Sequence, residues 1–314
     1  MTEKNELTIV TMLETTVDKT IDYEYNVTPY TLALPFMWML TAWVRMKKKC
    51  FGAKQEVNTI LFDARGTQCS RIRKYAATWQ SLDIIYNYKN GTGTRLDDFW
   101  INMRNAQAVR NRLKIIVREV LRASLTMHTN NMPVRILSLA CGSAQGVLEA
   151  TSQILNSGFD IKILLTDQDP EAEEMIAHHA NRLNLPRDVW EFKVVRLPNP
   201  IAIQRIARRF KPTIVEMVGL LDYLNNDLAL TVSGTIINDL LPRGGWFLTA
   251  HIHPNPEIVF LREVITWGQS PRMLYRTRTE FLELLVQAGG HLYVTESEPH
   301  GIHTVAVCIK DVST

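Results

Sequence analysis

The sequence is poor in the residues that mark several protein classes. Its four cysteines, Cys50, Cys69, Cys141 and Cys308, lie far apart and form no CxxC pair. Neither a disulfide scaffold nor a zinc or other metal site is therefore expected, and a reducing compartment fits best. The formal net charge of +3 over 314 residues is too small to indicate a nucleic-acid partner by itself. The chain also has no internal repeat and no low-complexity segment.

One apolar run, residues 31–44, is too short to cross a membrane. It falls short of the roughly 20 residues that a bilayer requires, and Pro35 interrupts it. The run therefore fits a buried or subunit-interface helix. Because Lys47, Lys48 and Lys49 follow it closely, peripheral membrane contact is the alternative. A homodimer through this helix is plausible. Residues 1–6 lack the pattern of a secretory signal, so we expect a cytoplasmic protein.

Two regions of the chain differ in their predicted elements. Residues 1–130 hold helical stretches, predicted at 30–48, 70–86 and 96–125, and form a helical N-terminal extension. From residue 131 to residue 314 strands and helices alternate, which predicts a parallel sheet covered on both faces. Strands are predicted at 134–140, 161–166, 191–196, 213–218 and 245–252, and helices at 145–157, 170–183, 199–209, 225–241 and 278–288. Two last strands, 291–297 and 303–310, are joined so closely that they must run antiparallel.

The most informative segment is residues 135–146, RILSLACGSAQG. An apolar strand enters a turn of small residues with Gly142 at its centre, and a helix follows. Such a turn lets a ligand approach the backbone at a helix N-terminus. A second strand ends at Asp167, and a carboxylate in that place accepts hydrogen bonds from the hydroxyls of a ribose. The pair indicates a site for a nucleoside-bearing cofactor.

Five segments in order resemble the class I S-adenosylmethionine-dependent methyltransferases. They are ILSLACGSAQG, LLTDQDP, PTIVEMVGLLDYL, LLPRGGWFLTA and RTEFLELLVQAGGHLYV, and they cover residues 133–310. The resemblance implies a Rossmann-like, mostly parallel seven-stranded sheet with an antiparallel C-terminal hairpin, and S-adenosyl-L-methionine as the cofactor. FWINMRNAQAVRNRLKIIVREV, with the later His-Pro pair and Arg276 to Arg278, is similar to a group of bacterial methyltransferases without an assigned substrate.

The resemblance also implies which residues hold the cofactor. The backbone of the glycine-containing turn would hold the methionine part, and Asp167 would bind the ribose. The ends of strands two and three would flank the adenine, and the end of strand four would line the methyl channel. The expected cofactor-binding residues are Ala140, Cys141, Gly142, Ser143, Asp167, Gln168, Arg196, Leu197, Val218 and Gly219. The chain departs from the family pattern at Ser138, where an acidic residue is common, and at Ala140 and Ala144. Because alanine adopts a positive φ only with strain, we expect a slightly wider turn.

Candidate catalytic residues follow strands four and five. Asp222 and Tyr223 either face the acceptor or form a polar helix start, and His251 and His253 are either a general base or structural histidines. Arg276 and Arg278 either hold an acidic acceptor or cap surface structure. Methyl transfer from a sulfonium needs no metal, and a base only for some acceptors.

Three functions remain open besides methyl transfer to a small molecule, which we favour. Arg110, Lys114, Arg118 and Arg122 recur on one face of a predicted helix and could follow the phosphates of an RNA substrate. A non-catalytic scaffold with this fold is a second alternative. A nicotinamide-dependent oxidoreductase is a third, against which the closing hairpin argues.

Overall fold

A computed structural model describes residues 21–52, 62, 64–269 and 271–310 of the chain. Residues 1–6, which we examined for a signal sequence, lie outside the described residues. The seven strands form one sheet in the order β3-β2-β1-β4-β5-β7-β6. The strands are β1 (Val134–Leu139), β2 (Ile161–Asp167), β3 (Trp190–Val194), β4 (Ile214–Val218), β5 (Trp246–Ile252), β6 (His291–Ser297) and β7 (His303–Ile309).

The sheet confirms the predicted mostly parallel arrangement with an antiparallel hairpin. β1 to β5 pair in parallel, whereas β7 runs antiparallel to both β5 and β6. Alternate residues of β1 point to opposite faces. Ile136 therefore lies in one hydrophobic core and Leu137 in a second core behind the sheet.

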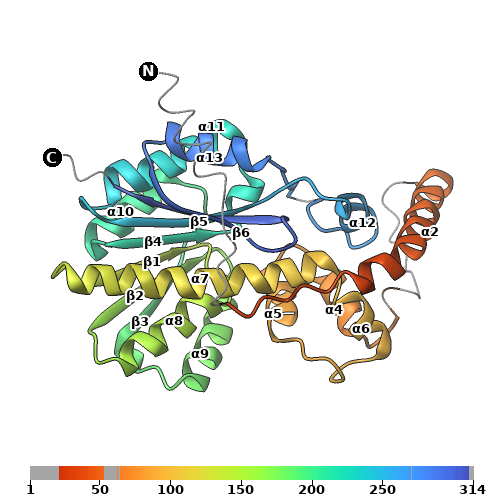
Figure 1. The fold of residues 1–314 in the computed structure, drawn as a ribbon, viewed down its shortest axis with the longest axis horizontal. Coiled ribbons are helices and arrows are strands. Elements are labelled where there is room, and N and C mark those ends of the chain that lie inside the picture. The colour runs from red at the N-terminus through yellow and green to blue at the C-terminus, as the bar shows by residue number, and fades with distance from the viewer. Residues whose placement is uncertain (1–20, 53–61, 63, 270, 311–314) are drawn as a thin grey trace.

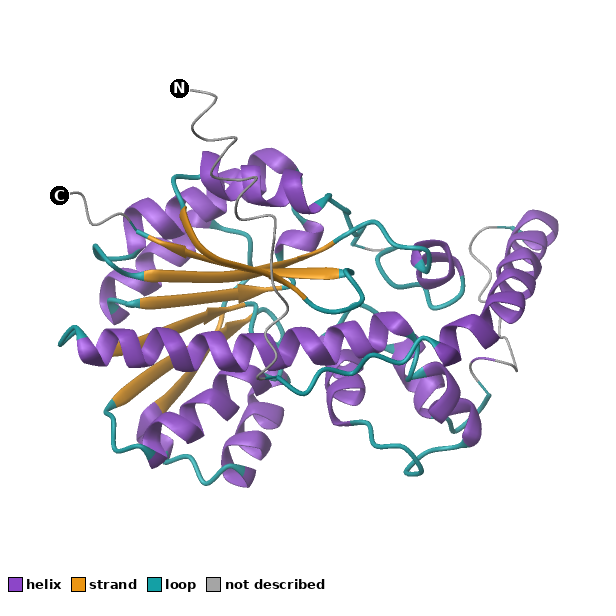
Figure 2. Ribbon diagram, viewed as in Figure 1, coloured by secondary structure: helices purple, strands orange, loops and turns teal. Residues whose placement is uncertain are grey.

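Helices cover both faces of the sheet, so the molecule has three layers (Figure 2). One face is covered by α7 (Arg104–Thr129), α8 (Gln145–Asn156) and α9 (Ala172–Arg182). The other is covered by α10 (Pro200–Phe210), α11 (Asn226–Gly234), a π-helical turn (Thr235–Leu240) and α13 (Arg278–Gln287). Two short 3-10 helices, Arg187–Val189 and Leu221–Tyr223, complete this part of the chain.

A group of further helices lies beyond one end of the sheet (Figure 1). We call this group the cap, and it has its own hydrophobic core, to which Trp100 and Phe260 belong. β7 starts at this end, and its His303 pairs with Ile252 at the end of β5. The cap therefore faces the carboxyl ends of the parallel strands. Its helices are α2 (Thr28–Phe51), α4 (Gln68–Lys74), α5 (Trp79–Asn87), α6 (Arg95–Trp100) and α12 (Ile258–Glu263), together with the start of α7.

Two predicted helices are each divided in the structure. The stretch 70–86 breaks between α4 and α5, where Ala77 has a φ of 63°. The stretch 96–125 breaks between α6 and α7, around the buried residues Trp100, Ile101 and Met103. In one continuous helix Trp100 and Met103 would share a face and Ile101 would point away from it, whereas the break lets all three enter the cap core. We did not predict α12, which is short.

The apolar run at residues 31–44 lies within α2. This helix buries Ala33, Met37, Leu40 and Val44 and leaves other large apolar side chains exposed, Trp38 among them. Within the residues described, the structure contains no helix of the length and apolar character needed to span a membrane. A homodimer through α2 stays a prediction.

Candidate active site

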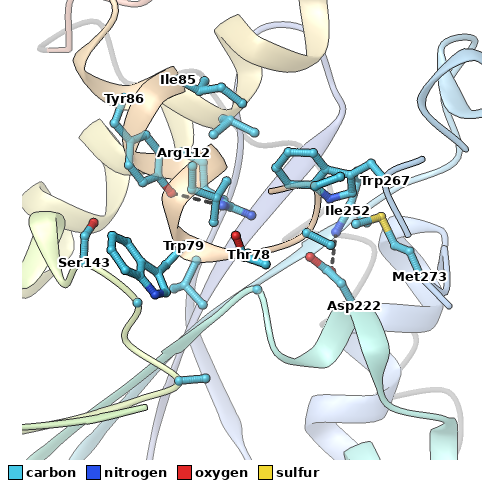
Figure 3. A pocket seen from close by; sticks show the side chains of 18 of the residues that line it. Thr78, Trp79, Ile85, Tyr86, Arg112, Ser143, Asp222, Ile252, Trp267 and Met273 are labelled. Carbon is cyan, nitrogen blue, oxygen red and sulfur yellow. Dashed lines mark hydrogen bonds between the residues drawn. The ribbon is translucent and has the colours of Figure 1, made fainter. Parts of the chain in front are cut away.

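A cavity of about 650 Å³ lies between the carboxyl ends of the strands and the cap. Its floor is formed by the turn after β1, the end of β2 and the loop after β4, and its roof by α4, α5, α6, the start of α7 and α12. Figure 3 shows Trp79 and Tyr86 of α5 on one side and Trp267 and Met273 on the other. The cavity thus joins the expected nucleoside site to a compartment enclosed by the cap.

The turn after β1 has three residues in the left-handed conformation. Ala140, Gly142 and Ala144 each have a φ of 53°. We expected a slightly wider turn because a positive φ strains alanine, whereas both alanines do adopt a positive φ. Each alanine pays about 1–2 kcal/mol of backbone strain in this conformation. The surrounding contacts hold the turn in place, because the Cys141 amide donates to the Thr166 carbonyl at 2.9 Å.

Asp167 lies at the end of β2 and binds the turn directly. Its Oδ2 accepts a hydrogen bond from the Gly142 amide at 2.9 Å, and its Oδ1 accepts one from the Asp169 amide at 3.0 Å. A carboxylate oxygen can accept about two hydrogen bonds, so each oxygen keeps capacity for a further donor. Asp167 is half-buried and lines the cavity. The two hydroxyls of a diol could therefore donate hydrogen bonds to this carboxylate.

Trp79 joins the cap to the same turn. Its indole N–H donates to Asp169 Oδ2 at 2.6 Å. The Trp79 Cβ also lies so close to Gly142 that a Cβ added there would approach it to 2.8 Å. Two features therefore require glycine at position 142: its positive φ, and the close packing of α5 against it. Asp169 also accepts from the Glu171 amide at 3.0 Å, and α9 begins only at Ala172.

Glu216 of β4 provides a buried carboxyl group beside the turn. It pairs in register with Ser138 of β1, and the Ser138 hydroxyl donates to its Oε2. Ser138 is the position where the resembling family commonly has an acid. Burial raises the pKa of Glu216 to about 7. The acidic side chain that β1 lacks at Ser138 is thus present on the neighbouring strand β4, as Glu216, and Glu216 lines the cavity.

Most of the residues expected to bind the cofactor lie together on the cavity wall. Arg196 is the exception, because it is exposed and does not line the cavity, whereas the next residue, Leu197, does. The expected residues that do line it are Ala140, Cys141, Gly142, Ser143, Asp167, Gln168, Leu197, Val218 and Gly219. Their role in binding stays a prediction. In the described part of the chain, no three His, Cys, Asp or Glu side chains lie together as a metal ion would require.

The structure does not place His251 or His253 on the cavity wall. His251 is fully buried, its Nδ1 lies 2.8 Å from Asp222 Oδ1, and its Nε2 accepts from the Arg276 amide at 3.1 Å. His253 Nδ1 lies 2.8 Å from the Arg276 carbonyl oxygen, and its Nε2 lies 2.7 Å from the Thr304 hydroxyl. Both rings are thus engaged inside the protein. The geometry fits the structural alternative for these histidines, and we do not propose either as a base.

Asp222 and Tyr223 do line the cavity, as one alternative expected. Asp222 Oδ1 also accepts from the Ile252 amide at 3.0 Å, so His251 and β5 together fix its carboxylate. Burial raises the pKa of Tyr223. Tyr223 therefore keeps its proton and can act as a hydrogen-bond donor, but not as a base. Burial likewise raises the pKa of the Cys141 thiol well above its usual range, which leaves it a poor nucleophile.

Three polar residues of the cavity were not predicted from the sequence. Arg112 is 4% exposed, and its Nε has no hydrogen-bond partner within the described chain. The same holds for both ring nitrogens of His303 and for Oε1 of Glu257. Burial lowers the pKa of His303 well below its usual range, and the nearby Arg112 adds to this, so the ring is neutral. All three residues line the cavity, and each has a buried side-chain atom without a partner among the residues that the structure describes.

Arg276 holds the loop after β4, a geometry that fits the structural alternative for this residue. It is buried, and its guanidinium donates to Asn226 Oδ1 and to the carbonyl oxygens of Leu221 and Leu224. Arg278 donates to Thr295 of β6. Neither residue lines the cavity.

The basic face of α7 is occupied by acidic side chains of the same chain. Arg110 is buried and forms an ion pair with Glu24 at 2.6 Å, and Lys114 lies 3.7 Å from the same carboxylate. Arg118 bridges Glu119 and Glu296, and Arg122 lies 3.4 Å from Glu119. This face is therefore not a row of free cations for phosphates, and the structure gives the RNA alternative no support.

Comparison with known proteins identifies the family. The model of a family described as "Putative methyltransferase" matches residues 53–310. This chain belongs to that methyltransferase family. The match includes most of the cap as well as the sheet, so the family shares both parts of this methyltransferase. No curated protein matches the chain.

Solved structures share the fold of this methyltransferase at low sequence identity. A protein of Bordetella parapertussis described as a possible exported protein is 13% identical, with a TM-score of 0.60 over 91% of this chain and all of that one. The magnesium protoporphyrin IX methyltransferase of Synechocystis, solved with bound SAH, is 11% identical, with a TM-score of 0.50 over 77% of this chain and 99% of that one. At these identities the similarity establishes the fold.

Proposed function

We propose that this methyltransferase uses S-adenosyl-L-methionine to methylate a small molecule inside the cavity beneath the cap. The observation that carries the proposal is the continuity of the cavity. It runs from Asp167 and the turn after β1 to the enclosed compartment around Tyr223 and Trp267. Its volume of about 650 Å³ lies within the range of roughly 300–1,000 Å³ typical of small-molecule sites.

The residues at the floor of the cavity fit this cofactor. Asp167 keeps hydrogen-bonding capacity for the two ribose hydroxyls while it holds the Gly142 and Asp169 amides. Gln168 and Leu197 border the place where we put the adenine. The left-handed turn at residues 140–144 leaves backbone exposed to the methionine part. Glu216, beside Ser138, would offer a carboxylate to the methionine ammonium, a task that the resembling family gives to β1.

When bound, the cofactor would supply a methyl group on a sulfonium, which is already an activated leaving group. The chain's own residues then have to orient the acceptor and exclude water, because positioning carries most of such a reaction. Trp267, Met273 and the cap helices enclose the compartment. His303 is the histidine of the described chain that lines it, and its neutral ring could accept a hydrogen bond that orients an acceptor hydroxyl.

Two further observations support a small acceptor. The cap roofs the cavity, and the basic face of α7 is already paired with Glu24, Glu119 and Glu296. The Synechocystis protein that shares this fold is named for a small-molecule acceptor, magnesium protoporphyrin IX. We also propose that residues 1–130 form a helical extension that shapes acceptor choice, and that residues 131–314 hold the cofactor.

Two measurements test this proposal. Titration calorimetry should detect binding of S-adenosylmethionine, and absence of binding at about millimolar cofactor would favour a non-catalytic scaffold. The purified protein should also transfer a radiolabelled methyl group from the cofactor to a component of a metabolite extract. Label found in RNA instead would contradict the small-molecule assignment.

A further inference from the structure

Arg112 places a buried positive charge on the cavity wall. It projects from α7, is 4% exposed, and lines the cavity. One of its terminal nitrogens donates to the Tyr86 hydroxyl at 3.2 Å, and its Nε has no partner in the described chain. Figure 3 shows the guanidinium between Tyr86 and Trp267, with Asp222 across the cavity. Unlike the other basic residues of α7, Arg112 thus faces the ligand space.

A guanidinium in this position needs an acceptor that the protein does not fully provide. It carries five N–H donors in a planar fork, and leaving such donors buried without acceptors costs free energy. Asp222 acts on Arg112 electrostatically, but its Oδ1 is already shared by His251 and the Ile252 amide. A planar anion that accepts two parallel hydrogen bonds is the natural partner, and a carboxylate has that shape.

The position of Arg112 favours the acceptor as the source of this carboxylate. The groups around it are Tyr86 in the cap, Glu216 of β4, Asp222 and Tyr223 after β4, and His303 at the start of β7. Asp167, where we place the ribose, ends β2. Four strand spacings, about 19 Å at ~4.8 Å each, separate β2 from β7 in the sheet. Asp167 and His303, one of the groups that interact with Arg112, therefore lie at opposite sides of the cavity.

The part of the cavity wall that the cap and the segment after α12 supply is aromatic and apolar. Figure 3 shows Trp267 on the far side of the Arg112 guanidinium from Tyr86. Trp100, Phe260 and Met273 also line the cavity, and the Trp100 and Phe260 ring centroids lie 5.1 Å apart. Such walls suit a flat, apolar body. We propose that the methyl acceptor is an aromatic carboxylic acid whose carboxylate is bound by Arg112 and Tyr86. This inference rests on the proposed function, because it names the acceptor of the same site.

The test is a calorimetric comparison of aryl carboxylates with their own carboxamides. A panel of hydroxybenzoates and hydroxynaphthoates and the matching amides is titrated into the full-length protein, with and without saturating S-adenosylhomocysteine. We expect at least one acid to bind about tenfold to a hundredfold more tightly than its amide. Arg112→Gln, which keeps donors but removes the charge, should abolish this preference. Arg122→Gln, on the partly exposed side of the same helix, is the matched control and should retain it.

The outcomes separate this inference from the proposed function. If every acid binds no better than its amide, or if none binds, the inference is overturned. It is also overturned if Arg112→Gln weakens S-adenosylhomocysteine but not methylthioadenosine, since Arg112 would then hold the cofactor's own carboxylate. If the acid preference is present and S-adenosylhomocysteine does not bind, the carboxylate site at Arg112 stands, whereas the proposed function fails and with it the role of the acid as methyl acceptor. Should Arg112→Gln not fold, Tyr86→Phe is expected to reduce the same preference, and an unchanged preference there counts against the proposal.

Discussion

Replacing Asp167 by alanine tests the nucleoside site at the residue where the structure is most explicit. Each carboxylate oxygen of Asp167 accepts one backbone amide, at 2.9 and 3.0 Å, and keeps capacity for a ribose hydroxyl. Hydrogen bonds to a charged group contribute about 1.5–3 kcal/mol. Asp167→Ala should therefore weaken S-adenosylhomocysteine binding by about 1.5–3 kcal/mol, a factor of roughly 10 to 150.

The same substitution also leaves the amides of Gly142 and Asp169 without their acceptor. The turn itself could therefore loosen, so affinity alone does not isolate the ribose contact. Asp167→Asn is an intermediate variant, because its single amide oxygen can still accept one of the two backbone N–H groups, whereas its NH2 group cannot accept the other. We expect Asp167→Asn to melt between Asp167→Ala and the wild type and to bind with intermediate affinity.

Calorimetry on the three proteins, together with thermal melts of each without ligand, gives the answer. Loss of affinity in both variants, with the larger loss in Asp167→Ala, is the expected result. If Asp167→Ala binds S-adenosylhomocysteine as tightly as the wild type does, Asp167 does not hold the ribose. The reasoning would then fail at its first step.

Three further predictions concern stability, each measured as the free energy of unfolding in urea. Arg118→Met removes the cation that the buried carboxylates of Glu119 and Glu296 share, and it should lower the free energy of unfolding by about 3 kcal/mol. Arg122→Met removes only a partly exposed ion pair and should lower it by less than about 1 kcal/mol. Equal losses would contradict the pairing described. Because the folded protein keeps the proton of Glu216 up to a pKa of about 7 and the unfolded chain releases it near 4.5, the unfolded chain binds fewer protons between these values. Stability should fall with rising pH across that window, by about 3 kcal/mol, and Glu216→Gln should remove this fall; an identical pH profile in the variant would refute it. Gly142→Ala should cost more than Gly158→Ala, because both have positive φ but only Gly142 would bring a Cβ to 2.8 Å from Trp79. Similar costs would show that α5 does not pack on the turn as described.

The sheet could be predicted because its signals are local. Apolar runs interrupted by Pro and Gly mark each strand, and the observed strand ends differ from the predicted ones by two residues or fewer. The order of the elements in the chain also fixed the parallel crossovers and the closing hairpin. Asp167 and the turn at Gly142 were predicted for the same reason, because a strand end and the residues that follow it stay together in any such sheet.

The acceptor side could not be predicted in the same way, because it depends on packing between distant segments. His303 reaches the cavity only because β7 pairs with β5, and His251 is turned inward by Asp222 and Arg276. Arg112 had a signal that we did not use. It lies on the apolar side of its helix, spaced three and four residues from Val109 and Ile116, where a basic residue needs a specific partner.

The central claim is tested most directly by a crystal structure of the protein with S-adenosylhomocysteine. The account predicts the ribose hydroxyls on the Asp167 carboxylate, the amino-acid end at the turn of residues 140–144 beside Glu216, and the sulfur directed toward the compartment beneath the cap. A ligand bound with its ribose away from Asp167, or a cavity that admits no adenosine at all, would contradict it.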